Sequence, residues 1–340
     1  MDKISLCGLL PDEINKALEL KESFRGKQIF RWIASGVESF DEMTNLSQVL
    51  REDLKTKAEL RTTKVSDVLR DSDGTIKLQI QLHDGLCVET VLLIDAEDRK
   101  TACVSSQAGC PMACKFCQTG KLGFARNLTA GEIIEEFFHL EKIAGKLDNI
   151  VFMGMGEPLL NLEAVRKAIT VLSDKNGRNL SVRRITISTS GIISGIYDLA
   201  DNGPAVRLAV SLTTADEQLR TELMPVNKTN PLDKLSEAIK YYSEKTGNRC
   251  TLEAALLSGV NTGPESARAM KKFAGSMPVH INLIPWNPVE GLSYKEPSPS
   301  ECKAFIKMLE GYGLKVTQRT RRGREIGGAC GQLGKTGLRN

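Results

Sequence analysis

The chain has 340 residues, a length that allows one large domain or two unequal domains. Hydrophobic residues make up 41% of the sequence and aromatic residues 5%, so the composition is that of a soluble globular protein. No apolar run approaches the roughly 20 residues of a membrane span, and early acidic residues exclude a signal peptide. The net charge of +4 is modest, so its distribution is more informative than its size.

Basic residues gather near the C-terminus. Six of them follow Gln318, against the single acidic residue Glu325. They are Arg319, Arg321, Arg322, Arg324, Lys335 and Arg339. This distribution predicts a phosphate-bearing partner at the C-terminal segment, although a solvated basic tail explains it equally well.

The first 95 residues contain two kinds of element. Apolar spacing predicts helices over 13–21, 27–36 and 47–60. Two strands, 77–82 and 87–94, follow and are separated by a His-Asp-Gly turn. We therefore expect a small helical region over 1–60 and a β connector over 61–95.

From about residue 100 strands and helices alternate. The predicted strands are 101–106, 149–154, 184–189, 206–212, 250–256 and 280–286. The predicted helices between them are 131–144, 162–173, 232–246 and 265–275. This alternation indicates an α/β fold with a parallel sheet, and six units suit a partial (β/α)6 barrel over 96–310. A helix over 300–313 and a strand over 314–320 close the fold, and 311–340 adds the basic tail.

Polar or glycine-rich motifs follow four of the predicted strands. They are GMGEP, STSG, SLTTA and NPVEG. Ligands of parallel α/β sheets gather at the carboxyl ends of the strands, so we expect these motifs to share one rim.

Cys110, Cys114 and Cys117 form a C-x3-C-x2-C loop without a fourth cysteine. Nine cysteines without a secretory signal indicate a reducing compartment, here the cytoplasm, where clustered cysteines favour metal binding. A structural zinc site needs four ligands, but Cys103 lies on a predicted strand and His139 on a helix face expected to be solvated. Three thiolates can instead hold a [4Fe–4S] cluster whose fourth iron is open. The iron–sulfur interpretation is favoured, and S-adenosylmethionine (SAM) suits the open iron; zinc stays as the alternative.

The motifs CVSSQAGC, FMGMGEPLLN, TISTSG, NLIPWNP and ACGQL occur in this order. Together they resemble the RlmN/Cfr family of radical SAM adenine methyltransferases, and the likeness begins at FRGKQIFRWI in the helical region. GEPLLN, STSG and LIPWNP are similar to the RlmN form, which methylates adenine C2. A Cfr-like C8 methyltransferase conferring ribosomal antibiotic resistance and a non-catalytic zinc RNA-binding protein are the alternatives.

The resemblance implies one [4Fe–4S] cluster per chain, held by Cys110, Cys114 and Cys117. It also implies SAM contacts at Gly156, Glu157, Ser188, Ser211, Leu212, Thr213 and Asn287. The family usually has His at the position of Thr213, so no side-chain role is carried over to it.

The resemblance further implies a two-stage reaction that consumes two SAM molecules. Cys330 first carries the methyl group as S-methylcysteine, and a covalent protein–RNA adduct then forms on adenine C2. Cys103 releases the product by forming a disulfide with Cys330, and Glu89 matches the proposed proton acceptor. Without the resemblance, Cys103 would be equally consistent with a core residue, and Glu89 with a surface strand carboxylate.

The implied partners are 23S rRNA at the peptidyl-transferase centre, tRNA at the adenosine 3′ of the anticodon, and an electron donor such as flavodoxin or ferredoxin. A monomer that does not bind membranes is expected. Methylation of a base edge requires a flipped nucleotide. The residues expected to contact phosphates are Arg25, Lys27, Arg31, Arg183, Arg184 and the cluster from Arg319 to Arg324.

Overall fold

A computed structural model describes residues 3–275, 277–335 and 337–339 of the chain. In this part of the chain ten strands form one mixed sheet, of which seven neighbours run parallel. In spatial order they are β6 (Lys100–Cys103), β9 (Asn149–Phe152), β10 (Ile185–Thr189), β11 (Arg207–Ser211), β12 (Cys250–Leu256), β13 (Val279–Pro285) and β14 (Val316–Gln318). The predicted α/β fold with a parallel core sheet is confirmed.

Three antiparallel strands extend the sheet beyond β6. They are β5 (Cys87–Ile94), β4 (Ile76–Gln81) and β3 (Lys64–Arg70). The sequence predicted β4 and β5 but not β3, because β3 is almost entirely exposed and lacks apolar alternation. The range expected as a connector therefore continues the main sheet.

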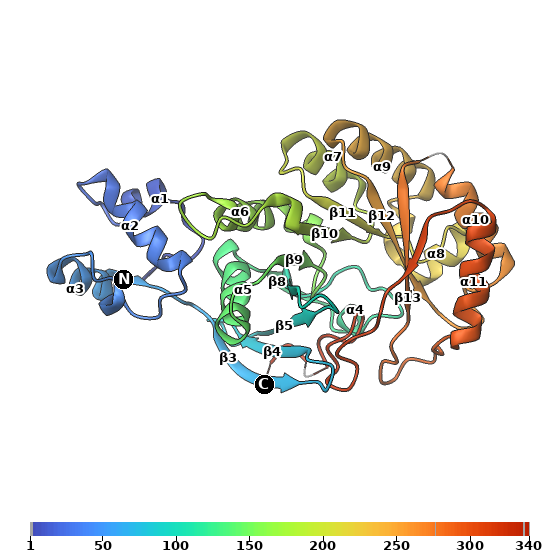
Figure 1. The fold of residues 1–340 in the computed structure, drawn as a ribbon, viewed down its shortest axis with the longest axis horizontal. Helices are drawn as coiled ribbons and strands as arrows, with labels where there is room; N and C mark the ends of the chain where they lie inside the picture. The colour runs from blue at the N-terminus through green and yellow to red at the C-terminus, as the bar shows by residue number, and fades with distance from the viewer. Residues whose placement is uncertain (1–2, 276, 336, 340) are drawn as a thin grey trace.

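Helices connect and cover the parallel strands (Figure 1). They are α5 (Ala130–Ala144), α6 (Leu162–Ser173), α7 (Ile193–Asn202), α8 (Glu217–Leu223), α9 (Leu232–Thr246), α10 (Pro264–Ala274) and α11 (Pro299–Gly311). The start of α5 shows how local sequence sets a boundary: Thr129 Oγ1 accepts the Glu132 N–H at 3.2 Å, and Glu132 accepts the Thr129 N–H at 2.8 Å. The sequence missed α7 and α8, since α7 contains Gly195 and α8 has only seven residues.

The N-terminal helices lie at one end of the molecule (Figure 1). They are α1 (Pro11–Ala17), α2 (Ser23–Ala34) and α3 (Gln48–Lys57), joined by the parallel pair β1 (Ile4–Ser5) and β2 (Ala58–Glu59). Glu135 of α5 accepts backbone N–H groups of Thr62 at 3.0 Å and Thr63 at 2.8 Å. These bonds attach the helical region to the core.

The C-terminal segment runs back across the molecule to the antiparallel strands (Figure 1). The Cys87 N–H donates to the Leu338 carbonyl at 2.9 Å, and Leu86 bridges to Arg339. The segment therefore lies beside strands that precede it by about 250 residues in the chain. Within the described residues, no helix is long and apolar enough to cross a membrane.

We expected His139 to lie on a solvated face of α5, and this prediction is wrong. It is half-buried, and its Nε2 lies 2.9 Å from Thr63 Oγ1. Burial and the nearby charges of Arg61 and Lys142 lower its pKa to about 4. His139 is therefore neutral in the fold at pH values where an unfolded chain would protonate it.

Acidification should weaken the fold through His139. Between pH 6.5 and 4 the unfolded state binds a proton that the folded state excludes, so stability falls as the pH decreases. Urea unfolding of wild type and His139→Gln across this range measures the effect. We expect the free energy of unfolding of the wild type to fall more steeply than that of the variant; parallel curves would contradict this.

Candidate active site

The three-cysteine loop lies between two short antiparallel strands, β7 (Gln107–Gly109) and β8 (Phe124–Asn127). The Cys110 N–H donates to the Gly123 carbonyl at 2.7 Å, which closes the loop at its base. A Cβ on Gly109 would lie 2.1 Å from that same carbonyl, so only glycine allows this approach. A short helix, α4 (Gln118–Lys121), follows the third cysteine.

The donor set fits an iron–sulfur cluster better than a single metal ion. Burial raises the pKa of all three thiols, and the charges of the neighbouring thiols contribute to the rise at Cys110, to about 12, and at Cys114. Bound iron would supply the positive charge that three thiolates need here. The loop supplies three thiolates and no fourth cysteine, one fewer than a closed tetrahedral zinc site needs, and this set suits thiolates that each bind a different iron.

The predicted SAM contacts lie at one edge of the sheet. Gly156 and Glu157 follow β9, and Ser188 lies within β10. Ser211 ends β11 and is followed by Leu212 and Thr213, whereas Asn287 follows β13. Because these strands are parallel neighbours, the structure brings the motifs to their common carboxyl edge.

Glu157 is a buried carboxylate beside the cysteine loop. Its Oε2 accepts from the Ser190 N–H at 2.7 Å and from Ser190 Oγ at 2.8 Å. Burial nevertheless raises its pKa. A cationic ligand such as the SAM ammonium would favour the ionised form, so Glu157 fits the predicted contact.

Two of the five buried side-chain oxygens that lack partners among the described residues are Asn287 Oδ1 and Ser106 Oγ. Asn287 Nδ2 donates to the Cys330 carbonyl at 3.2 Å, which fixes the side chain beside the Cys330 loop. A buried acceptor without a donor is costly, so this position suits a ligand N–H or O–H group. SAM carries both kinds of donor.

Thr213 adopts a left-handed backbone conformation, with φ of 58°. For a β-branched residue this is strained, and such strain needs support from its surroundings. The Thr213 N–H donates to Glu253 O at 3.1 Å, and its carbonyl accepts from Asn261 Nδ2 at 2.9 Å. Its backbone is therefore held rigidly at the end of β11.

The sequence analysis missed Arg220, a fully buried residue of α8. Arg220 donates to the Ser190 carbonyl at 2.7 Å and to the Leu212 carbonyl at 3.2 Å. It therefore connects the loops after β10 and β11, where SAM contacts are predicted. A charged residue in an unrecognised helix gave no indication of burial.

The Cys330 loop, residues 327–334, packs against the three-cysteine loop. The Gln118 N–H donates to the Gly331 carbonyl at 2.7 Å, and Thr119 Oγ1 donates to the Leu333 carbonyl at 2.7 Å. Trp286 directly follows β13, and its Nε1 donates to the Phe116 carbonyl at 2.8 Å. This bond anchors the three-cysteine loop. The two loops, more than 200 residues apart in sequence, thus form one unit.

Glu89 is buried, which excludes the surface carboxylate considered from sequence. Its Oε1 lies 2.9 Å from Lys77 Nζ, and the two side chains are 3% and 5% exposed. Glu89 Oε2 accepts the Gly334 N–H at 2.6 Å, and Lys77 Nζ donates to the Gly327 carbonyl at 3.4 Å. This ion pair therefore holds both ends of the Cys330 loop.

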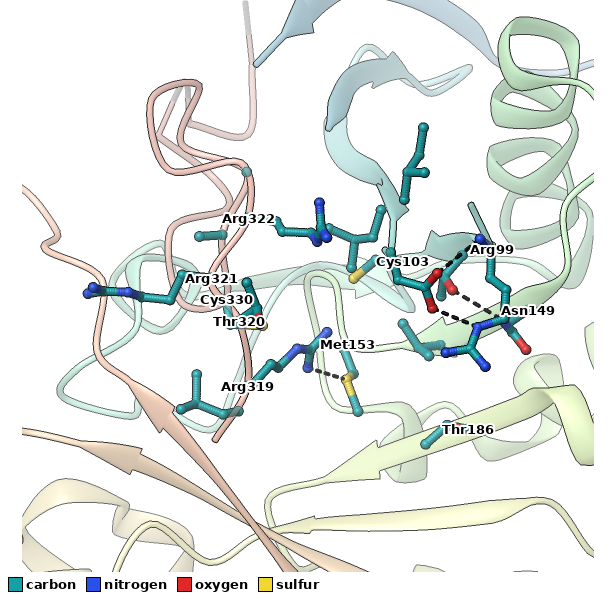
Figure 2. A pocket seen from close by; sticks show the side chains of 18 of the residues that line it. Arg99, Cys103, Asn149, Met153, Thr186, Arg319, Thr320, Arg321, Arg322 and Cys330 are labelled. Atoms are coloured by element: carbon teal, nitrogen blue, oxygen red, sulfur yellow. Dashed lines mark hydrogen bonds and ion pairs between the residues drawn. The ribbon is translucent and has the colours of Figure 1, made fainter. Parts of the chain in front are cut away.

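Cys103 and Cys330 line one cavity of about 610 Å³, together with Asn287 (Figure 2). Six arginines line the same cavity: Arg99, Arg184, Arg207, Arg319, Arg321 and Arg322. Several residues expected to contact phosphate are thus at the cavity, whereas Arg25, Lys27 and Arg31 lie on α2 in the N-terminal region. Arg321 and Arg324 also pair with Glu296.

The chain matches two family models. The Radical SAM superfamily matches residues 104–269, and the ribosomal RNA large subunit methyltransferase N-terminal domain matches residues 15–60. A Treponema denticola protein named "Probable dual-specificity RNA methyltransferase RlmN" is 59% identical over 99% of this chain and 97% of its own. A Moorella thermoacetica protein with the same name is 45% identical over 97% of both chains.

A solved structure shows the same fold over nearly the whole chain. It is a radical SAM methyltransferase from Sphaerobacter thermophilus, 38% identical, with a TM-score of 0.93. The match covers 97% of this chain and 99% of that chain.

Replacing Lys77 with Met should release the Cys330 loop. Removing one partner of a buried ion pair costs about 3–5 kcal/mol, because the remaining charge stays buried and unpaired. We expect lower stability in urea unfolding and faster hydrogen exchange at residues 327–334. Lys57→Met, which breaks an exposed pair with Asp53, should cost at most about 1 kcal/mol. Unchanged hydrogen exchange at residues 327–334 in the Lys77 variant would contradict the role of the Lys77–Glu89 pair in holding the Cys330 loop.

Proposed function

This chain belongs to the RlmN family of dual-specificity RNA methyltransferases, in the radical SAM superfamily, and we propose that it methylates adenine C2 in 23S rRNA and tRNA. The observation that carries the proposal is the cavity shared by Cys103 and Cys330 beside the three-cysteine loop. A transfer through two thiols requires both to reach one substrate position. The fold brings Cys103 and Cys330, which are far apart in the sequence, to the same cavity.

The chain's donors support one [4Fe–4S] cluster at Cys110, Cys114 and Cys117. SAM would bind at the carboxyl edge of the sheet. There Glu157 would contact its ammonium group, and Asn287 Oδ1 would accept a hydrogen bond from SAM. When bound, the cluster with SAM supplies the one-electron chemistry that breaks an unreactive C–H bond. An electron donor such as flavodoxin or ferredoxin is required, and two SAM molecules serve each methylation.

The two cysteines have separate roles in the proposed reaction. Cys330, on a loop flanked by glycines, would carry the methyl group, and the carbon on its sulfur would form the bond to adenine C2. Cys103, fixed at the end of β6, would then attack the Cys330 sulfur as a thiolate. The S–S bond forms as the S–CH2 bond breaks, and the carbon leaves with the electron pair and takes up a proton as the methyl group of the released base. A rigid strand suits Cys103 as the attacking sulfur. A loop flanked by glycines suits Cys330 as a carrier that must change position.

Glu89 is proposed as the proton acceptor. Its oxygens contact Lys77 and the Gly334 N–H, so the carboxylate is fixed close to the Cys330 loop. These contacts also support a positioning role, since the same carboxylate holds one end of that loop.

The cavity arginines support RNA binding. A flipped adenosine would enter the cavity, while arginines such as Arg184 and Arg322 contact its phosphates. Residues 1–60 would form the accessory RNA-binding region, and their basic residues on α2 extend the contact area. We propose that the protein acts as a monomer in the cytoplasm.

The position of the new methyl group tests the proposal against the C8 alternative. RNA incubated with the reconstituted protein, SAM and a reductant is digested to nucleosides. These are separated by liquid chromatography against 2-methyladenosine and 8-methyladenosine standards, because the two isomers have the same mass, and are detected by mass spectrometry. We expect 2-methyladenosine from both 23S rRNA and tRNA. Finding 8-methyladenosine, or no methylated adenosine, would contradict the proposed function.

Replacing Cys103 with Ala should trap the protein on RNA. Without the second thiol the Cys330 adduct cannot be released, so protein purified from cells should carry covalently bound RNA. Cys302→Ala is the matched control, because Cys302 lies on α11 and is not among the residues lining the cavity. Free Cys103→Ala protein that still makes normal product would exclude the role of Cys103.

A further inference from the structure

Arg319 enters the cavity from the edge of the sheet. It follows β14 directly, and its N–H donates to the Leu283 carbonyl of β13 at 2.9 Å. Figure 2 shows its side chain extending between the positions of Cys103 and Cys330. The backbone of Arg319 is therefore fixed while its guanidinium faces both sulfurs.

The guanidinium has few partners for a half-buried charge. Its Nη1 donates to Met153 Sδ at 3.5 Å, and a thioether is a weak acceptor. Among the described residues no carboxylate forms an ion pair with Arg319, whereas Arg321 and Arg324 share Glu296. The negative charge of Glu253 acts on Arg319 at a distance. The Glu253 oxygens accept hydrogen bonds from Asn282 Nδ2 at 3.0 and 3.2 Å. Most of the donor capacity of Arg319 is thus available inside the cavity.

Cys103 needs a positive charge nearby. Burial, together with the neighbouring Cys330 and Glu136, raises its pKa to about 12. Arg319 and a hydrogen bond from the Met153 backbone act in the opposite direction. Met153 therefore contacts both partners, the Cys103 thiol through its backbone and Arg319 through its sulfur.

We propose that Arg319 is a positioning residue that stabilises negative charge on the sulfurs of Cys103 and Cys330. The thiolate is the nucleophilic form of cysteine, and a guanidinium stays charged throughout the physiological pH range. One arginine can serve both sulfurs in turn, because it lies between them. This inference rests on the proposed roles of the two cysteines.

The test measures thiol reactivity without RNA and without turnover. Full-length protein is purified anaerobically and treated with iodoacetamide between pH 6 and 10, and labelling of Cys103 is followed by peptide mass spectrometry. Each labelling event forms one S–C bond and releases iodide. Failure of methylation would thus be separate from failure of this inference.

We expect Arg319→Met to slow labelling of Cys103 about tenfold at pH 8, the effect of roughly one pKa unit, and to shift its pH profile upward. Arg319→Lys keeps the charge and should retain most of the wild-type rate. Arg322→Met also removes a positive charge at the cavity and should leave the profile unchanged.

Three outcomes would overturn the inference. One is an unchanged pH profile in Arg319→Met, which would show that the charge of Arg319 does not act on the Cys103 sulfur. The second is equal slowing in Arg319→Lys and Arg319→Met, which would indicate lost packing and not lost charge. The third is equal slowing in Arg322→Met, which would indicate a general effect of cavity potential.

Discussion

The buried ion pair between Lys77 and Glu89 is the constraint on which the rest of the site depends. It lies on two adjacent antiparallel strands, yet it binds Gly327 and Gly334, about 250 residues later in the chain. The loop between these glycines carries Cys330 and packs on the three-cysteine loop. Removing one partner of a buried ion pair is costly, because the other charge stays buried and unpaired. The antiparallel extension of the sheet therefore holds the thiol of Cys330 in a defined place.

The chemistry of the site comes from two parts of the chain. Cys103 and the proposed SAM contacts belong to the parallel sheet and its carboxyl edge, where strand pairing fixes their positions, and the proposed cluster ligands lie in the loop between β7 and β8. Cys330 belongs to a glycine-rich loop that is held at both ends by the Lys77–Glu89 pair and in its middle by hydrogen bonds to the Cys330 and Gly331 carbonyls. Burial raises the pKa values of Cys103 and Glu157 and so favours the neutral forms of these two groups. Charged partners therefore set which groups can react, and arginines supply most of that charge.

Much of the fold and the site could be predicted from the sequence. The parallel strands have apolar runs, and the motifs after them mark the carboxyl edge. Other features depended on distant contacts. Lys77 and Glu89 lie on strands with polar residues, and their burial follows partly from a C-terminal segment that covers them. Arg220 was missed because the charged, seven-residue α8 has no helical apolar pattern. His139 is half-buried because the segment after β2 packs on α5, a contact between separate regions of the chain.

The most direct test of this account is the disulfide that the two outlying cysteines can form. Protein freed of its cluster is oxidised with diamide, which accepts two electrons and two protons from a pair of thiols, and its disulfides are mapped by mass spectrometry. The account predicts that a Cys103–Cys330 disulfide forms first in the wild type and far more slowly in Lys77→Met. If Cys330 paired instead with another cysteine, or if the Lys77 variant formed the disulfide as readily, the ion pair would not position the loop.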